Sequence, residues 1–89
     1  MSWTLRITRK AENDLAEAKL GNAFLQRAEA VFQGIQATPE MHATVFEDVR
    51  RAMLRRFPYQ VLYRLDEDSV VVIAVYHNRR DPRGWRERV

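Results

Sequence analysis

Alternating apolar and polar residues near the start of the chain predict its first strand. Trp3, Leu5 and Ile7 are separated by polar side chains, which is the period-two pattern of a strand with one buried face. Thr8 follows directly and is a residue type that caps helices. We therefore expect a short strand that leads straight into a helix.

Two helices are predicted next, because apolar residues recur at helical spacing on either side of Gly21. The first helix buries one stripe and is expected to turn its acidic residues, Asp14 among them, toward water. The second extends from Ala23 to about Gln36, and Thr38 and Pro39 end it. The apolar stripes consist of Ala11, Leu15 and Ala18 in the first helix and of Phe24, Ala28, Val31 and Ile35 in the second.

The second half of the chain is rich in strand patterns. Residues 44–57 fit both a helical and a strand period, but Pro58 pushes Phe57 toward an extended conformation, which favours a strand or bulge. Residues 59–65 alternate as a strand, an acidic turn follows, and residues 70–76 are apolar on both faces, as in a covered central strand. This order predicts the α+β class: a two-layer β-α-α-β-β-β domain whose helical hairpin packs on a small, mostly antiparallel sheet.

Length and composition narrow the possible functions. The 89 residues suit one domain over residues 1–89, and the absence of cysteine excludes disulfides, thiolate metal ligands and a thiol nucleophile. No apolar run is long enough to span a membrane, so we expect a cytoplasmic protein with no membrane partner. The three glycines stand far apart, which excludes a phosphate-binding glycine loop, and His42 and His77 lack carboxylates at metal-ligand spacing. We expect neither a cofactor nor a metal.

Charge is unevenly distributed along the chain. Residues 1–49 carry five basic and seven acidic side chains, whereas residues 50–89 carry ten basic side chains, all arginine, and five acidic ones. Arginine offers a planar fork of donors that matches phosphate and carboxylate groups. The second half therefore predicts a surface that recognises a polyanion or an acidic protein, although a solvated arginine face that only keeps the protein soluble explains the same pattern.

The arginines are expected to gather on and around the sheet, and aromatic side chains lie among them. Tyr63, Tyr76 and Trp85 offer stacking surfaces for nucleic acid, but the tyrosines fit core positions better. His77 ends the central strand. One interpretation gives its ring a role in proton transfer, but a single histidine at a strand end more often has a structural role.

Residues 49–65 and 70–82 resemble the RelE/ParE toxin superfamily of type II toxin–antitoxin systems. The likeness rests on several spaced elements: an Arg-Arg-Phe-Pro-Tyr block over residues 55–59, Tyr-Arg at 63–64, and His-Asn-Arg-Arg-Asp-Pro over residues 77–82. It implies a small bacterial toxin held inactive by a cognate antitoxin in a hetero-oligomeric complex. RelE-type members cut mRNA on the ribosome, whereas ParE-type members inhibit DNA gyrase.

The resemblance favours the ParE-like branch. A strand arginine of the RelE-type nucleases falls on Gln60, and their C-terminal tyrosine falls near Gly84 and Trp85, so two expected groups are missing. Arg51 and Arg79 match nuclease positions, and His77 is a candidate substitute for the acid or base. In a departure that counts against both branches, the hairpin between Lys19 and Phe24 is shorter than the family usually has.

Three functions follow as hypotheses. The first is a gyrase inhibitor neutralised by an antitoxin, and its expected target-binding residues are Arg51, Arg55, Arg56, Arg79, Arg80 and Trp85. The second is a ribosome-dependent mRNA endonuclease, an mRNA interferase, that uses Arg51, His77 and Arg79. The third is a non-toxic nucleic-acid-binding module. In either toxin hypothesis the target is gyrase or the ribosome with its mRNA.

Overall fold

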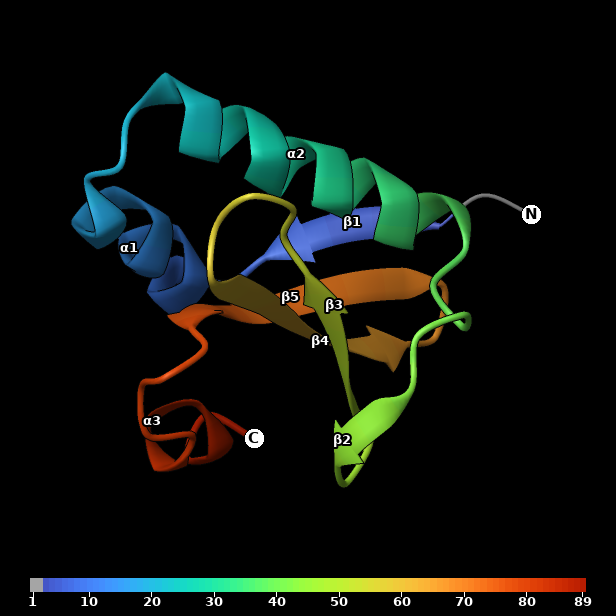
Figure 1. The fold of residues 1–89 in the computed structure, drawn as a ribbon. Coiled ribbons are helices and arrows are strands. Elements are labelled where there is room, and N and C mark those ends of the chain that lie inside the picture. Colours follow the sequence, from blue (N-terminus) through green and yellow to red (C-terminus); the bar gives the residue numbers. More distant parts are fainter. Residues whose placement is uncertain (1–2) are drawn as a thin grey trace.

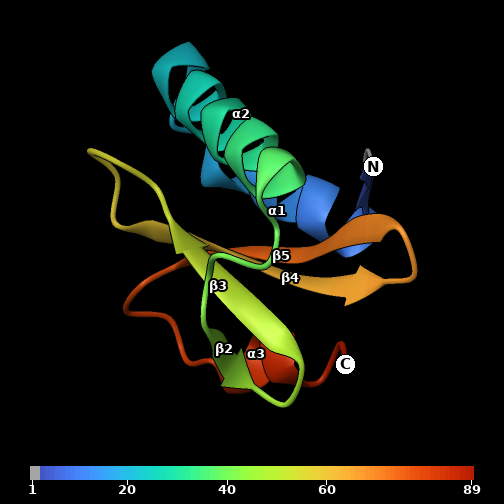
Figure 2. The ribbon, with the colours of Figure 1, turned by 90° about the vertical axis from the view of Figure 1, so that its right-hand side faces the viewer.

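The computed structural model describes residues 3–89, which form a five-stranded sheet with two helices on one face and a short helix on the other (Figures 1 and 2). The elements in chain order are β1 (Thr4–Ile7), α1 (Arg9–Ala18), α2 (Asn22–Ala37), β2 (Thr44–Phe46), β3 (Val49–Met53), β4 (Tyr59–Asp66), β5 (Ser69–His77) and α3 (Arg83–Arg86). None of the described helices is long and apolar enough to cross a membrane.

The strand order is β1-β5-β4-β3-β2, so the two longest strands lie near the middle of the sheet. β1 pairs with β5 in parallel, and the other neighbours pair antiparallel. The expected α+β class, with a helical hairpin on a mostly antiparallel sheet, is confirmed.

Two elements were not expected from the sequence. The ambiguous residues 44–57 contain two strands, β2 and β3, instead of one, because Glu47 takes a left-handed conformation (φ 51°) that lets the chain reverse between them. β2 has only three residues, too few to show a period. The tail, which has no period, forms the single turn of α3.

The helices cover one face of the sheet because their apolar stripes face it. Thr8 caps α1 as predicted, since its Oγ1 accepts a hydrogen bond from the Ala11 amide at 3.2 Å. The buried residues of this core come from both helices, three strands and the residue just after β3: Ala11, Phe24, Ala28, Phe32, Ile35, Ala52, Leu54, Val61, Tyr63, Val70, Val72 and Val75.

A second, smaller core lies on the opposite face, where α3 and β2 sit (Figure 1). Its buried residues are Val49, Leu62, Ile73, Ala74, Tyr76 and Trp85. β5 therefore has apolar side chains on both faces, as its sequence predicts.

A β-bulge in β5 determines toward which face of the sheet the last side chains of that strand point. Leu62 pairs with Ala74 while Tyr63 pairs with Val72, so Ile73 has no partner in β4. Because side chains alternate with a period of two, this extra residue reverses the faces beyond it. His77 consequently lies on the helix-covered face, opposite Tyr59, and Tyr76 lies on the α3 face.

Close contact between α3 and Tyr76 requires a glycine at position 84. A Cβ there would overlap the Tyr76 hydroxyl oxygen and lie 3.2 Å from Cζ, and the Tyr76 ring is 1% exposed and unable to retreat. We expect Gly84→Ala to lower the free energy of unfolding by about 1–3 kcal/mol through overpacking, as measured by urea denaturation.

Gly34 provides the matched control for that substitution. It lies in the exposed part of α2, where a Cβ would meet no atom within 4 Å, and alanine favours a helix interior. Gly34→Ala is therefore expected to raise the free energy of unfolding by about 0.5–1 kcal/mol. Equal effects of the two substitutions would contradict the close contact at Tyr76.

Tyr63 anchors the segment between α2 and β2 to the sheet. Its hydroxyl donates to the Pro39 carbonyl at 2.6 Å and lies 3.3 Å from His42 Nδ1. Burial raises the pKa of this phenol above its ordinary value of 10.0, although the nearby Arg50 charge lowers it in part.

The raised pKa of Tyr63 predicts a loss of stability at alkaline pH. Below the unfolded pKa both states hold the proton, but as pH rises through that value the unfolded phenol ionises first, so the free energy of unfolding falls. The stability difference between the wild type and Tyr63→Phe should therefore be constant up to about pH 9 and shrink as the pH rises further in urea unfolding curves. A difference that stays constant over the whole range would show that the Tyr63 pKa is not raised.

Candidate functional site

Two loops bring four of the candidate arginines to one end of the sheet, whereas Arg51 lies within β3. The first connects β3 to β4 and carries Arg55 and Arg56, and the second leaves β5 and carries Arg79 and Arg80. The Asn78 amide of the second loop donates to the Pro58 carbonyl of the first at 2.8 Å, so the loops are joined by a main-chain hydrogen bond.

Each loop is held in a defined shape by its own main chain. In the first, the Leu54 amide donates to the Tyr59 carbonyl at 3.0 Å, and Arg56 occupies the left-handed region (φ 72°) to complete the reversal. In the second, the Arg80 amide donates to the His77 carbonyl at 3.0 Å. The loops therefore present their side chains from fixed backbones.

Five candidate arginines are exposed and make up what we call the arginine surface: Arg51, Arg55, Arg56, Arg79 and Arg80. The ion pairs found within residues 3–89 involve other arginines, namely Arg64, Arg83 and Arg88. None of these five arginines is therefore held in an ion pair by the described acidic side chains, which suits recognition of an anionic partner.

The arginines of residues 50–89 differ in their contacts, as Arg50 and Arg80 show. Arg50 donates to the carbonyls of Glu40 and His42, at 3.1 and 2.5 Å, and thereby holds the segment before β2. The Arg80 guanidinium lies 4.2 Å from the centre of the Tyr76 ring, so its stem is oriented while its charge remains exposed.

The sequence places Trp85 on the contact surface, but the structure buries it. It is only 3% exposed, because α3 turns its ring into the core on the sheet face opposite α1 and α2, where it meets Phe46 at 5.8 Å between ring centres. The ring attaches α3 to the sheet instead of offering a stacking face. Tyr63 and Tyr76 are core residues as well, in agreement with the structural interpretation of their positions.

His77 stands at the end of β5 with one ring nitrogen already engaged. Its Nδ1 accepts the Arg79 amide hydrogen at 3.1 Å, and its ring meets Tyr59 edge-on at 5.2 Å. In the neutral ring the proton therefore resides on Nε2, which makes this nitrogen a donor instead of a base.

The sheet separates Arg51 from His77. Arg51 pairs with Leu62, whose side chain belongs to the core beneath α3, whereas His77 pairs with Tyr59, whose ring contacts Phe24 of α2. Directly paired residues share a face, so these two candidate nuclease groups lie on opposite faces. Gln60 is buried and pairs with Tyr76, which places it on the Arg51 face without a charge.

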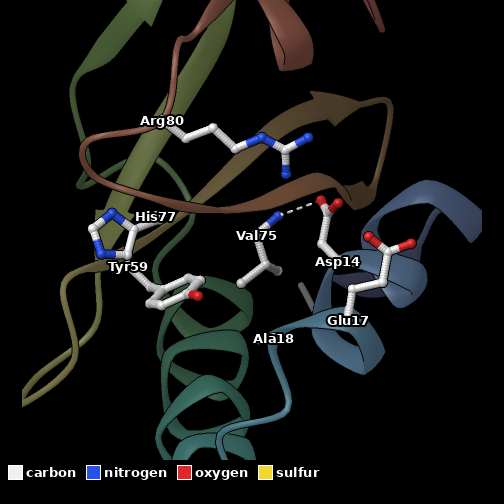
Figure 3. Close-up of a pocket in the computed structure, with 7 residues that line it drawn as sticks. All are labelled: Asp14, Glu17, Ala18, Tyr59, Val75, His77 and Arg80. Carbon is white, nitrogen blue, oxygen red and sulfur yellow. Dashed lines mark hydrogen bonds between the residues drawn. The ribbon is translucent and has the colours of Figure 1, made fainter.

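A small cavity of about 170 Å³ adjoins His77 (Figure 3). It is lined by residues of α1, β4, β5 and the loop after β5: Asp14, Glu17, Ala18, Tyr59, Val75, His77 and Arg80. The cavity lies where β5 extends beyond the end of β1, and Asp14 occupies part of this open strand edge by accepting the Val75 amide hydrogen at 3.0 Å.

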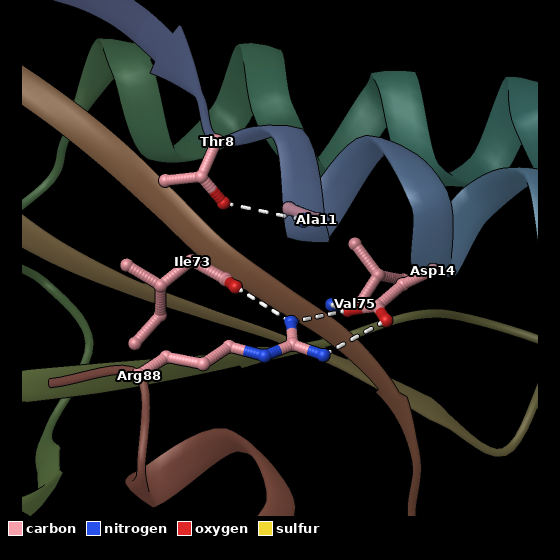
Figure 4. Close-up of polar contacts among 6 residues, drawn as sticks. All are labelled: Thr8, Ala11, Asp14, Ile73, Val75 and Arg88. Atoms are coloured by element: carbon pink, nitrogen blue, oxygen red, sulfur yellow. Dashed lines mark hydrogen bonds and ion pairs between the residues drawn. The ribbon is translucent and has the colours of Figure 1, made fainter.

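Asp14 and Arg88 form a buried ion pair that the sequence does not predict (Figure 4). Asp14 was expected to face water, but its side chain is 7% exposed and accepts two hydrogen bonds from Arg88, at 2.7 and 3.1 Å. Arg88 also donates to the Ile73 carbonyl at 2.8 Å, and the Asp14 hydrogen bond holds the pKa of its guanidinium above the ordinary value. The pair ties the C-terminal segment to α1 and β5. Seventy-four residues separate its members, so no local pattern reveals it.

Comparison with known proteins adds a family and a fold. Residues 5–82 match the family model described as the ParE toxin of the type II toxin–antitoxin system parDE. A curated protein of Mycobacterium tuberculosis (strain CDC 1551 / Oshkosh), Toxin ParE2, is 30% identical over 95 residues, which cover 92% of this chain and 88% of that protein.

Solved structures share the fold at lower identity. A chain of the chromosomal ParDE system from P. aeruginosa matches with a TM-score of 0.71 and 19% identity, over 85% of this chain and 96% of that one. A chain of the intact E. coli RelBE toxin–antitoxin complex matches with a TM-score of 0.71 and 24% identity, over 89% of this chain and 100% of that one.

Proposed function

The chain belongs to the ParE toxin family of type II toxin–antitoxin systems, and from this membership we propose that it inhibits DNA gyrase by binding and not by catalysis. The membership confirms the RelE/ParE superfamily predicted from residues 49–82. The toxin acts as a single domain over residues 1–89, in the cytoplasm where its target is.

The separation of Arg51 from His77 is the observation that carries this proposal. A nuclease needs its acid, its base and its phosphate-binding groups around one scissile bond. Here the sheet stands between Arg51 and His77, His77 Nδ1 is occupied by the Arg79 amide, and Gln60 supplies no charge. A binding surface has no such requirement, and the arginine surface is exposed and free of ion pairs with the described residues.

A cognate antitoxin is the proposed partner. One fold relative is a chain of the E. coli RelBE toxin–antitoxin complex and another belongs to the ParDE toxin–antitoxin system of P. aeruginosa, and the exposed arginine surface suits an acidic partner. The two proteins form a hetero-oligomer in which the antitoxin masks the positive charge and blocks the target.

The mRNA interferase remains the second candidate because one contact favours it. The Arg79 amide fixes the His77 ring at the strand end with Nε2 as the hydrogen-bond donor, and an oriented donor stabilises negative charge that develops on a leaving oxygen. In this alternative Arg79 binds the phosphate, the His77 Nε2–H donates a hydrogen bond to the leaving oxygen, and water supplies the proton that this oxygen takes up.

Expression of the chain in cells without antitoxin tests the proposal against both alternatives. The gyrase proposal expects growth arrest, induction of a DNA-damage reporter and intact mRNA. Codon-phased mRNA 5′ ends that disappear in His77→Ala would instead establish the interferase. Harmless expression, together with salt-sensitive binding of the purified chain to nucleic acid, would favour the non-toxic binding module.

A further inference from the structure

The arginine surface contains an exposed apolar side chain. Met53 is the last residue of β3, so it lies between Arg51 within that strand and Arg55 in the loop that follows. It is 50% exposed and is the one exposed large apolar residue of the described strands. Charged groups mainly steer and accelerate association, whereas apolar anchors supply much of the binding energy of an interface. Met53 therefore offers a contact that the arginines alone do not provide.

Strand pairing connects Met53 to the other end of the same face. Met53 pairs with Gln60 of β4, and Gln60 pairs with Tyr76 of β5. Directly paired residues share a face, so these three side chains form a row across the sheet on the face that carries α3. The Arg80 guanidinium lies 4.2 Å from the centre of the Tyr76 ring. Because Arg51 shares the face of Met53 two residues before it, positive charge lies at both ends of the row.

Gln60, in the middle of the row, has a restricted side chain and an amide that is open to a partner. The residue is 9% exposed, so packing restricts its side chain. The side-chain hydrogen bonds of residues 3–89 involve other groups. The fully buried side-chain atoms without a partner in this range belong to Arg64 and Trp85, so the Gln60 amide reaches the surface. Its donor and acceptor together match a main-chain peptide group of a bound protein.

The same face suits a protein segment better than a single-stranded nucleic acid. Bases stack on exposed aromatic rings, but no aromatic residue within residues 3–89 is exposed. In this row Tyr76 is 1% exposed, and Trp85 on the same face is 3% exposed. Methionine is an adaptable apolar residue that is enriched at protein interfaces, and arginine pairs with carboxylates in a forked geometry.

We propose that a segment of gyrase binds this row, with an apolar side chain on Met53, acidic side chains at Arg51 and Arg80, and a main-chain peptide group at the Gln60 amide. The inference rests on the proposed function and adds two specificity-determining residues, Met53 and Gln60, together with the chemistry of the segment that they recognise. Both residues are uncharged, so the arginine pattern of the sequence does not reveal them.

Oxidation of methionine by hydrogen peroxide tests the contact in the complex with purified gyrase. Met41 is the internal control, because it is 77% exposed in the segment between α2 and β2. Excess gyrase should slow conversion of Met53 to its sulfoxide by about fivefold or more, while Met41 is oxidised at the rate of the free chain. Mass spectrometry of peptides from the chain measures both rates. If the chain inhibits supercoiling but Met53 is protected no more than Met41, the inference is wrong and the proposed function stands.

Two substitutions test the residues separately. Met53→Gln should raise the concentration of chain that half-inhibits supercoiling by about tenfold or more, whereas the control Met41→Gln should change it by less than about twofold. Gln60→Leu keeps the volume and removes the amide, and should raise that concentration by about fivefold or more. Circular dichroism confirms that the variants are folded. Inhibition by folded Met53→Gln and Gln60→Leu at the wild-type concentration would refute the inference.

Growth arrest in cells separates this inference from the proposed function. Met53→Gln should relieve toxicity and Met41→Gln should not, whichever protein is the target. If Met53→Gln relieves toxicity but the wild-type chain does not inhibit gyrase, the proposed function is wrong and the contact face stands. Binding of a labelled single-stranded RNA that Met53→Gln and Gln60→Leu weaken as strongly as they weaken toxicity would assign the face to nucleic acid and overturn the inference.

Discussion

Asp14→Ala is expected to lower the free energy of unfolding by about 3–5 kcal/mol, the range for breaking a buried ion pair. The substitution leaves the Arg88 guanidinium, 13% exposed, without its carboxylate and removes the acceptor of the Val75 amide. Both the Arg88 charge and the Val75 amide at the edge of β5 therefore lose their partner. Urea denaturation followed by circular dichroism measures the change.

Two further variants test whether loss of the Asp14–Arg88 ion pair causes the lower free energy of unfolding of Asp14→Ala. Glu17→Ala, one helical turn along α1 and exposed, should change the free energy of unfolding by less than about 0.5 kcal/mol. Replacing both Asp14 and Arg88 with leucine should restore much of the loss, because apolar residues carry no desolvation penalty. If Asp14→Ala unfolds at the same urea concentration as Glu17→Ala, the pair does not hold the C-terminal segment.

Arg79→Ala combined with Arg80→Ala is expected to abolish toxicity while the fold is kept. Both side chains are exposed, and Arg80 loses only its contact with the Tyr76 ring, which at an exposed site contributes about 0.5–1 kcal/mol. If both act as central contacts, gyrase inhibition should weaken by at least about thirtyfold. Growth on induction and the inhibitory concentration measured with purified gyrase report the two effects.

A charge-matched control distinguishes the arginine surface from net charge. Arg9→Ala with Lys10→Ala removes the same two charges from the exposed start of α1, away from both loops. This variant should remain toxic. Full toxicity of a folded Arg79, Arg80 double variant would remove these residues from the binding surface.

Local patterns were sufficient to predict most of the fold. Thr8 as a cap, the stripes of α1 and α2, and the two-sided apolar run of β5 are each encoded within a few neighbouring residues. β2 was missed because three residues carry no period, and its reversal depends on the conformation of Glu47. The parallel pairing of β1 with β5 depends on long-range topology, which no local period encodes.

The candidate site was harder to predict because its arrangement depends on contacts distant in sequence. The exposure of Arg55, Arg56, Arg79 and Arg80 agrees with the sequence, but the face on which His77 lies is set by one extra residue in β5. The sequence places Trp85 among the expected target-binding residues, whereas α3 turns its ring inward. Both the face on which His77 lies and the burial of Trp85 depend on how the assembled sheet is built, so a local sequence pattern does not reveal them.

Supercoiling of relaxed plasmid by purified gyrase, with the purified chain as the one addition, tests the central claim most directly. The reaction contains no ribosome and no mRNA, so an mRNA interferase has nothing to act on. We expect the chain to inhibit supercoiling, the Arg79, Arg80 double variant to lose this inhibition and His77→Ala to retain it. Undiminished supercoiling in the presence of excess folded and toxic chain would contradict the central claim.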